Sequence, residues 1–143
     1  MTKRHVFVYG TLKRNERNHA YLVQAHFAGA TQTADDQYVM MAFHSRTSPG
    51  RFSPGVLRAA ALDHPFGFIE GEVFEVSDTQ LQALDRLENV GTSYDRDSVI
   101  LQDGRSAFIY IKRHGAEGIL PSPHISLNKD KIYRWREYNL GHS

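Results

Sequence analysis

The segment His5-Val6-Phe7-Val8-Tyr9-Gly10-Thr11-Leu12 is a run of β-branched and aromatic residues that stops at a glycine. This pattern predicts a short buried strand over residues 5–9, followed at once by a tight turn. Such a turn aims several free backbone N–H groups at one point, which is typical of an anion site. The Lys-Ser/Thr ending of a phosphate-binding loop is absent, so a carboxylate is as good a candidate for the bound anion as a phosphate. The alternative is an ordinary strand-to-loop turn with Gly10 at positive φ.

After this strand, the pattern predicts more strands than helices. Extended segments are expected at 30–34, 38–43, 56–62, 68–76, 94–101 and 106–112, and helices at 18–27 and 77–89. Asn18 is the candidate cap of the first helix, and Ser77 with Gln80 forms a capping box for the second. Ser48-Pro49-Gly50 and Ser53-Pro54-Gly55 predict two turns within a loop over 44–55. The chain after residue 113 allows a closing helix or an edge strand.

These elements predict the fold class. Six or seven strands against two or three helices, with mostly short connections, indicate an α+β fold whose sheet is mixed or curled into a barrel. No linker or shift in composition divides the chain, so residues 1–143 are expected to form one domain.

Composition excludes several kinds of site. The 143 residues include no Cys, which excludes a disulfide scaffold, a thiolate zinc site and a Cys nucleophile. The eight His show no metal-binding spacing, so no metal is expected. A net charge of +1 gives no overall attraction to nucleic acid. With no apolar run of membrane-spanning length and no secretory signal before Gly10, we expect a soluble, cytoplasmic protein without a membrane partner.

Glu88 is the candidate acid/base residue. It lies four residues after Leu84 and seven after Leu81, so it projects from the apolar side of the predicted helix. Burial, the negative end of the helix dipole and nearby Asp85 would each raise its pKa. A carboxyl group poised near neutrality can accept a proton and return it. The alternative is a solvated glutamate at a frayed helix end.

Two further polar patterns have both a functional and a structural interpretation. Glu70, Glu72 and Glu75 interrupt the apolar segment 68–76, and one of them could enter the barrel as a second carboxylate or as a partner of Arg58 or Arg96. An exposed strand edge is the simpler interpretation. Near the C-terminus, Lys131, Arg134 and Arg136 alternate with Tyr133, Trp135 and Tyr138, as in stacking surfaces for single-stranded nucleic acid. Aromatic rings packed on the body, with the charges outward, are favoured over that interpretation.

Two segments carry a family resemblance. Val6-Phe7-Val8-Tyr9-Gly10-Thr11-Leu12-Lys13-Arg14, followed by Asn18-His19, and Leu84-Asp85-x-Leu87-Glu88, followed by Tyr94-x-Arg96, resemble the γ-glutamylcyclotransferase-like family, in particular its γ-glutamylamine cyclotransferase branch. Ser53-Pro54-Gly55-Val56 and Gly71-Glu72-Val73-Phe74-Glu75-Val76 are also similar to segments of that branch, in the same order. The resemblance covers residues 5–112. Asn15 stands where the branch usually has Gly, and Asn is the next most tolerant residue at positive φ.

The resemblance implies a small mixed-strand β-barrel with flanking helices and a cofactor-free reaction. The α-amine of a small γ-glutamyl substrate would attack its own γ-carbonyl, form 5-oxoproline and expel the attached amine. The family pattern implies substrate binding by Tyr9, Gly10, Thr11, Leu12 and Tyr94, and general acid/base catalysis by Glu88. The leaving amine stays open among an amino acid, an isopeptide-linked lysine, a polyamine and another amine, and so does the oligomeric state. The alternatives are a non-catalytic module that binds small carboxylates and an adaptor acting through the aromatic-basic tail.

Overall fold

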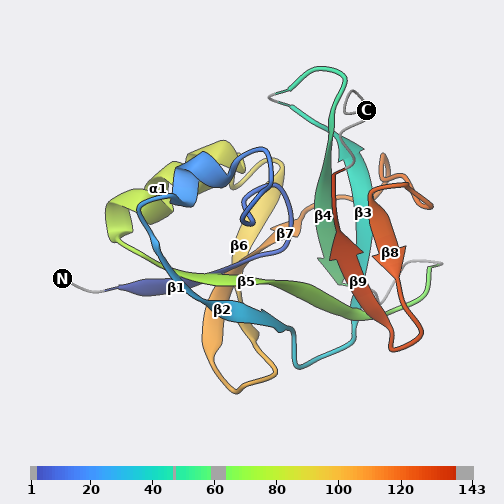
Figure 1. Cartoon of the computed structure of the whole chain (residues 1–143). Helices are drawn as coiled ribbons and strands as arrows, with labels where there is room; N and C mark the ends of the chain where they lie inside the picture. Colours follow the sequence, from blue (N-terminus) through green and yellow to red (C-terminus); the bar gives the residue numbers. More distant parts are fainter. Residues whose placement is uncertain (1–2, 47, 59–63, 138–143) are drawn as a thin grey trace.

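Strands dominate the computed structural model, which describes residues 3–46, 48–58 and 64–137 (Figure 1). Within these residues the chain forms nine strands, one α-helix and one short 3-10 helix. In chain order they are β1 (Arg4–Val8), η1 (His19–Leu22), β2 (His26–Gln32), β3 (Tyr38–His44), β4 (Phe52–Arg58), β5 (Phe68–Val76), α1 (Asp78–Leu87), β6 (Tyr94–Ile100), β7 (Ser106–Lys112), β8 (Ile125–Leu127) and β9 (Ile132–Trp135).

The first strand, β1, lies at the centre of the sheet. It pairs antiparallel with β5 and parallel with β7, where Val6 lies opposite Phe108. Phe7 packs into the apolar cluster inside the barrel, whereas Val6 and Val8 pack into a second cluster shared with α1. Both faces of β1 are therefore buried, which explains its unbroken run of apolar residues.

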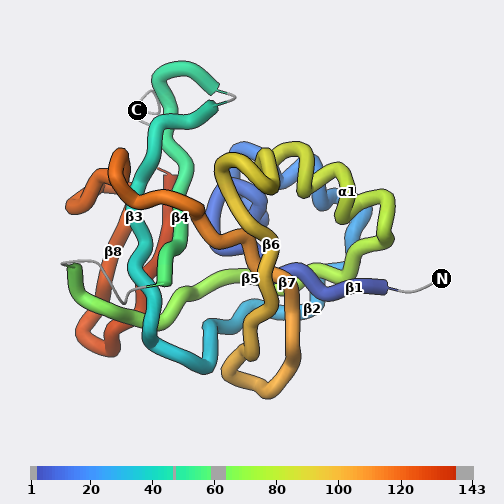
Figure 2. Tube along the Cα trace, turned by 180° about the vertical axis from the view of Figure 1, so that it is seen from behind, coloured from blue at the N-terminus to red at the C-terminus, as the bar shows by residue number. Residues whose placement is uncertain are grey.

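The sheet curls into a nearly closed barrel (Figures 1 and 2). Its strands follow the order β3-β4-β7-β1-β5-β9-β8, with β2 also paired to β5 and β6 also paired to β7. Parallel and antiparallel pairs both occur, so the predicted α+β fold with a mixed, barrel-like sheet is confirmed. The described residues contain more strands and fewer helices than the pattern predicted.

The helix α1 forms where it was predicted. The Ser77 hydroxyl accepts from the Gln80 N–H at 3.2 Å, and the Gln80 side chain accepts from the Ser77 N–H at 2.7 Å. Leu81 and Leu84 are buried in the second apolar cluster, so the helix lies against the outer faces of β1 and β5. The helix ends at Leu87 and Glu88 is its C-terminal cap residue, which fixes where the candidate carboxylate leaves the helix.

The predicted helix over 18–27 is wrong. Only His19–Leu22 forms a 3-10 turn, and β2 already begins at His26. The Asn18 side chain makes no cap hydrogen bond and donates instead to the Thr11 hydroxyl. Leu22 is the only buried residue of the turn, which is too little apolar surface to stabilise a longer helix.

The predicted turn at Ser53-Pro54-Gly55 is also wrong, because these residues lie inside β4. This strand pairs with β3 along its whole length but with β7 only at Val56, where the ladder partner is Ile111. A proline is tolerated where pairing is this one-sided. The turn at 48–50 is confirmed by a hydrogen bond from the Arg51 N–H to the Ser48 carbonyl. The predicted strand 56–62 is described only as far as Arg58.

The C-terminal segment forms an edge hairpin of β8 and β9 rather than a helix. Tyr133 is 1% and Trp135 0% exposed, so both rings pack in the barrel core and cannot stack on nucleic acid bases. Arg134 and Arg136 remain exposed between and beyond them. The favoured interpretation, with aromatic rings on the body and charges outward, is confirmed for this part, and Tyr138 lies outside the described residues. None of the helices described is both long and apolar enough for a membrane span.

We expect Leu84→Ala to lower the free energy of unfolding by about 2–5 kcal/mol, because it removes a fully buried side chain that holds α1 on the sheet. Gln82→Ala, at an exposed position on the same helix, is the matched control and should change stability by about 0.5 kcal/mol or less. Urea denaturation followed by circular dichroism measures both. Equal effects of the two variants would contradict the packing described for α1.

Candidate active site

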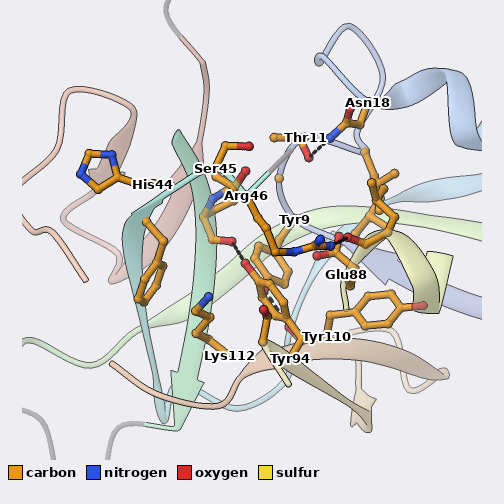
Figure 3. Close-up of a pocket in the computed structure, with 18 of the residues that line it drawn as sticks. Tyr9, Thr11, Asn18, His44, Ser45, Arg46, Glu88, Tyr94, Tyr110 and Lys112 are labelled. Atoms are coloured by element: carbon orange, nitrogen blue, oxygen red, sulfur yellow. Dashed lines mark hydrogen bonds between the residues drawn. The ribbon is translucent and has the colours of Figure 1, made fainter. Parts of the chain in front are cut away.

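One pocket opens where β1 ends (Figure 3). All the site residues predicted from the sequence line it: Tyr9, Gly10, Thr11, Leu12, Glu88 and Tyr94. The loop at 9–12 and the end of α1 are almost eighty residues apart in sequence, and the sheet brings them together because β1 and β5, which leads into α1, are hydrogen-bonded neighbours.

The loop after β1 is fixed through its carbonyl groups. The Gly10 carbonyl accepts from the Lys13 N–H at 3.1 Å, and the Thr11 carbonyl accepts from the Asn18 N–H at 2.7 Å. By contrast, the backbone N–H groups of Gly10, Thr11 and Leu12 donate to no acceptor among the described residues. Three unpaired donors in a pocket wall suit an anionic ligand, since an unpaired buried N–H is costly.

Gly10 is required for space rather than for backbone conformation. It is not among the residues with positive φ, contrary to the alternative interpretation of this turn. A Cβ atom at Gly10 would lie 2.3 Å from Cγ of Pro54, so only glycine allows the loop to pack on β4. Asn15 has a φ of 69°, which confirms that asparagine takes the left-handed position expected for it.

The Thr11 hydroxyl is oriented by Asn18. The Asn18 amide donates to Oγ1 of Thr11 at 3.1 Å (Figure 3), so the Thr11 oxygen is an acceptor in this bond. Its own proton is then free to be donated to a ligand in the pocket. Thr11 therefore adds a side-chain donor to the three backbone donors of the loop.

Two tyrosines form walls of the pocket, and their hydroxyl protons are already used. Tyr9 donates to the Tyr110 carbonyl at 2.7 Å, and Tyr94 donates to the Pro54 carbonyl at 2.8 Å. Burial raises the pKa of both phenols far above the ordinary range. Neither hydroxyl is thus suited to carry a proton in a reaction, and both hold neighbouring strands in place.

Glu88 is the one carboxylic acid among the described residues that line the pocket. It is half-buried, and burial raises its pKa to about 7, against the opposing charges of Lys112 and Arg46. Asp85 does not contribute as the sequence suggested, because its carboxylate is paired with Arg96 at 2.7 Å and accepts from the Tyr110 hydroxyl. Glu88 therefore exists in both protonation states near neutral pH.

Two cations that the sequence pattern does not indicate as site residues also line the pocket. Arg46 lies between β3 and β4, and its guanidinium donates to the carbonyl of Leu87 at 2.9 Å, at the end of α1. Lys112 is the last residue of β7. The only sequence signal for Lys112 is that it shares a strand face with the buried Tyr110, two residues earlier. Arg46 lies in a loop and gives no such signal.

The binding loop is tied to the C-terminal strand by buried charges. Lys13 is 8% exposed and its ammonium donates to the Trp135 carbonyl at 2.7 Å. Burial lowers the pKa of Lys13, while nearby carboxylates oppose that shift. Arg17 pairs with Glu137 at 2.9 Å, just beyond β9. These contacts give the segment after residue 113 a structural role in holding the loop.

The carboxylates of β5 do not enter the pocket. Glu70 pairs with Arg134, Glu72 with Arg14, and Glu75 with His26. The proposed pairs with Arg58 and Arg96 are wrong, since these arginines pair with Asp97 and Asp85. Among the described residues, no group of three or more His, Asp or Glu is arranged to hold a metal ion.

Comparison with known proteins identifies the family. The model of the "Gamma-glutamyl cyclotransferase, AIG2-like" family matches residues 6–135. The chain belongs to this family. The match extends beyond the region of resemblance seen in the sequence and includes β8 and β9. Because the match covers the loop and Glu88 together, the family assignment supports an enzyme of the γ-glutamyl cyclotransferase kind.

Relatives agree with this assignment. A Vibrio cholerae protein named "Putative gamma-glutamylcyclotransferase" is 31% identical over 118 residues, which is 82% of this chain and 90% of that protein. A Drosophila melanogaster protein of the same description is 32% identical over 124 residues, 80% of this chain and 73% of that protein. The mouse "Gamma-glutamylaminecyclotransferase" is 29% identical over 68% of this chain and 63% of that protein.

Solved structures share the fold. The crystal structure of a mouse AIG2-like protein superposes with a TM-score of 0.66 at 22% identity, covering 97% of this chain and 99% of that chain. Kluyveromyces lactis allophanate hydrolase gives 0.64 at 19% identity, with 80% of this chain and 18% of that chain covered. Proteins of different description thus use this fold, so the function must be argued from the pocket.

We expect Glu88→Gln to stabilise the protein above neutral pH. The folded state holds the Glu88 proton more tightly than the unfolded chain, so the native protein loses stability as pH rises from about 4.5 through 7. A neutral amide avoids this loss, so the variant should be more stable by about 1–3 kcal/mol at pH 8 and unchanged at pH 4.

Urea unfolding at the two pH values measures this difference. Asp130→Asn, on the exposed turn between β8 and β9, is the control and should show no such pH-dependent gain. A Glu88→Gln protein that is no more stable than the native protein at pH 8 would show that the carboxyl is not held in a desolvated position.

Proposed function

We propose that the protein is a cofactor-free cyclotransferase that releases 5-oxoproline from a γ-glutamylamine or a related γ-glutamyl substrate. The observation that carries this proposal is the placement of Glu88, with a pKa of about 7, in the same pocket as the unpaired N–H groups of Gly10, Thr11 and Leu12. One group handles protons and the other holds an anion, and a γ-glutamyl substrate needs both.

The loop donors suit the α-carboxylate of the substrate. Three backbone N–H groups and the Thr11 hydroxyl offer hydrogen bonds to a carboxylate, and hydrogen bonds to a charged acceptor are the stronger kind. Anchoring the carboxylate fixes one end of the flexible glutamyl chain. The chain can then fold back so that its α-nitrogen approaches its own γ-carbonyl carbon, an orientation effect that lowers the barrier of ring closure.

Glu88 can serve both proton transfers. The reaction starts from the uncharged form of the α-amine, and the ionised carboxylate accepts a proton from this nitrogen as it forms its bond to the γ-carbon. The resulting tetrahedral intermediate then breaks its bond to the leaving nitrogen, which takes the same proton from Glu88 and departs as a free amine. The products are 5-oxoproline and the amine, and the carboxylate is regenerated, so no water or cofactor is consumed.

Glu88→Gln should lower kcat by about 10²–10⁴-fold, because an amide cannot accept the proton of the attacking nitrogen. Binding of 5-oxoproline, measured by calorimetry, should be largely retained, since the loop donors are unchanged. In the native enzyme kcat/KM should rise with pH through about 7, as Glu88 ionises. The activity assay for both proteins measures the release of 5-oxoproline from a γ-glutamyl amide.

Undiminished release of 5-oxoproline by Glu88→Gln would remove Glu88 from the mechanism. A native protein that binds glutamate and 5-oxoproline but turns over no γ-glutamyl amide would instead be the non-catalytic carboxylate-binding module.

A further inference from the structure

The Lys112 ammonium feels the charges of Glu88 and Glu117, which oppose the lowering of its pKa by burial, but among the described residues neither carboxylate is close enough to pair with it. Its ammonium lies 4.5 Å from the ring centre of Phe43 and 4.8 Å from that of Tyr94. Within residues 3–46, 48–58 and 64–137, it forms no hydrogen bond and has no carboxylate within 4.0 Å. Two aromatic faces hold the ammonium in position but leave its N–H donors unused.

This ammonium stands at the junction of two hollows. Lys112 lines the pocket of Glu88 and also a neighbouring hollow beyond it. Phe43, His44 and Ser93 are shared by both, and Thr92, His114, Ala116 and Glu117 complete the second hollow. Figure 3 shows Lys112 on β7, apart from the loop that carries Thr11.

In the proposed reaction, the two hollows would receive the two sides of the bond that is broken. In the proposed reaction the glutamyl carboxylate occupies the N–H donors of the loop, and the γ-carbonyl lies near Glu88. The leaving amine is on the other side of that carbonyl, so it extends past Lys112 into the second hollow. An ammonium at this point meets the leaving group rather than the glutamyl carboxylate.

The charges around the junction favour an anion. Arg46 adds a second cation, and its charge and that of Lys112 both act on Glu88. Among the described residues that line the second hollow, Glu117 is the one carboxylate; its charge acts on Lys112, but it is exposed and more than 4.0 Å from the Lys112 ammonium. A ligand carboxylate would therefore be the closest acceptor for the Lys112 ammonium, in a partly desolvated place where charged hydrogen bonds gain strength.

Resting on the proposed function, we propose that Lys112 is a specificity-determining residue that binds a carboxylate on the leaving amine. The preferred substrates are then γ-glutamyl amides whose amine itself carries a carboxylate. Uncharged amines lose this contact, and cationic amines such as polyamines also meet the repulsion of Lys112 and Arg46.

A matched pair of substrates tests the contact. γ-Glutamylglycine and γ-glutamylglycinamide have nearly the same shape and differ in whether the leaving amine bears a carboxylate or a neutral amide. The native enzyme should prefer γ-glutamylglycine by about tenfold or more in kcat/KM, as expected for a hydrogen bond to a charged group. In Lys112→Met this ratio should fall to about one, and in Lys112→Arg it should persist.

The ratio separates specificity from the effect of Lys112 on Glu88. Removing Lys112 also raises the pKa of Glu88, but that change acts on both substrates and cancels in the ratio. Lys129→Met, at an exposed lysine near the turn between β8 and β9, is the control and should leave the ratio as in the native enzyme.

A native kcat/KM ratio near one for the two substrates would overturn the proposal. An equal loss of kcat/KM for both substrates in Lys112→Met would also overturn it, because the ammonium would then act on the reacting carbonyl. If the native enzyme releases 5-oxoproline from neither compound, the cyclotransferase proposal fails. Calorimetric binding of the same two compounds to the native protein and to Lys112→Met then decides the role of Lys112 independently: a preference for the carboxylate that disappears in the variant supports it, and its absence contradicts it.

Discussion

The contact between Gly10 and Pro54 is the constraint on which the pocket depends. A methyl group at Gly10 would overlap the proline ring, so the loop after β1 packs its Gly10 backbone directly on the Pro54 ring of β4. The carbonyl of the same proline accepts the hydrogen bond of Tyr94, which ties β6 to this point. Three segments far apart in sequence are thus joined at one proline, which fixes the loop that carries the unpaired N–H groups.

The site keeps charged groups in places that cost stability. Glu88 is placed where burial disfavours its ionised form, and Lys13 is buried behind the loop with a single carbonyl acceptor. Burial of a charged group costs free energy unless pairing or hydrogen bonds offset it, so such groups are expected where a function or a specific position needs them. Lys13 sets the position of the loop through Trp135, and Glu88 gains a pKa suited to proton transfer. The burial of these two groups, although unfavourable for stability, agrees with a pocket that binds an anion and transfers a proton.

Local patterns in the sequence predicted part of this arrangement and missed the rest for physical reasons. The strand before Gly10 and the helix after Ser77 follow from apolar periodicity and a capping box, which are properties of neighbouring residues. The local pattern predicts a turn at Pro54 because proline and glycine usually mark turns. Its actual place inside β4 depends on which strands flank it, which the local pattern does not contain. Lys112 is unremarkable in sequence, and only the folded sheet places it between Phe43 and Tyr94. Sites assembled from distant segments therefore need the tertiary structure, or a family pattern, to be seen.

A crystal structure with bound 5-oxoproline tests the central claim most directly. The account predicts that its carboxylate accepts hydrogen bonds from the backbone of Gly10, Thr11 and Leu12, and that its ring nitrogen lies within hydrogen-bond distance of the Glu88 carboxyl. A ligand bound elsewhere, or bound at the loop with Glu88 turned to bulk solvent, would contradict it.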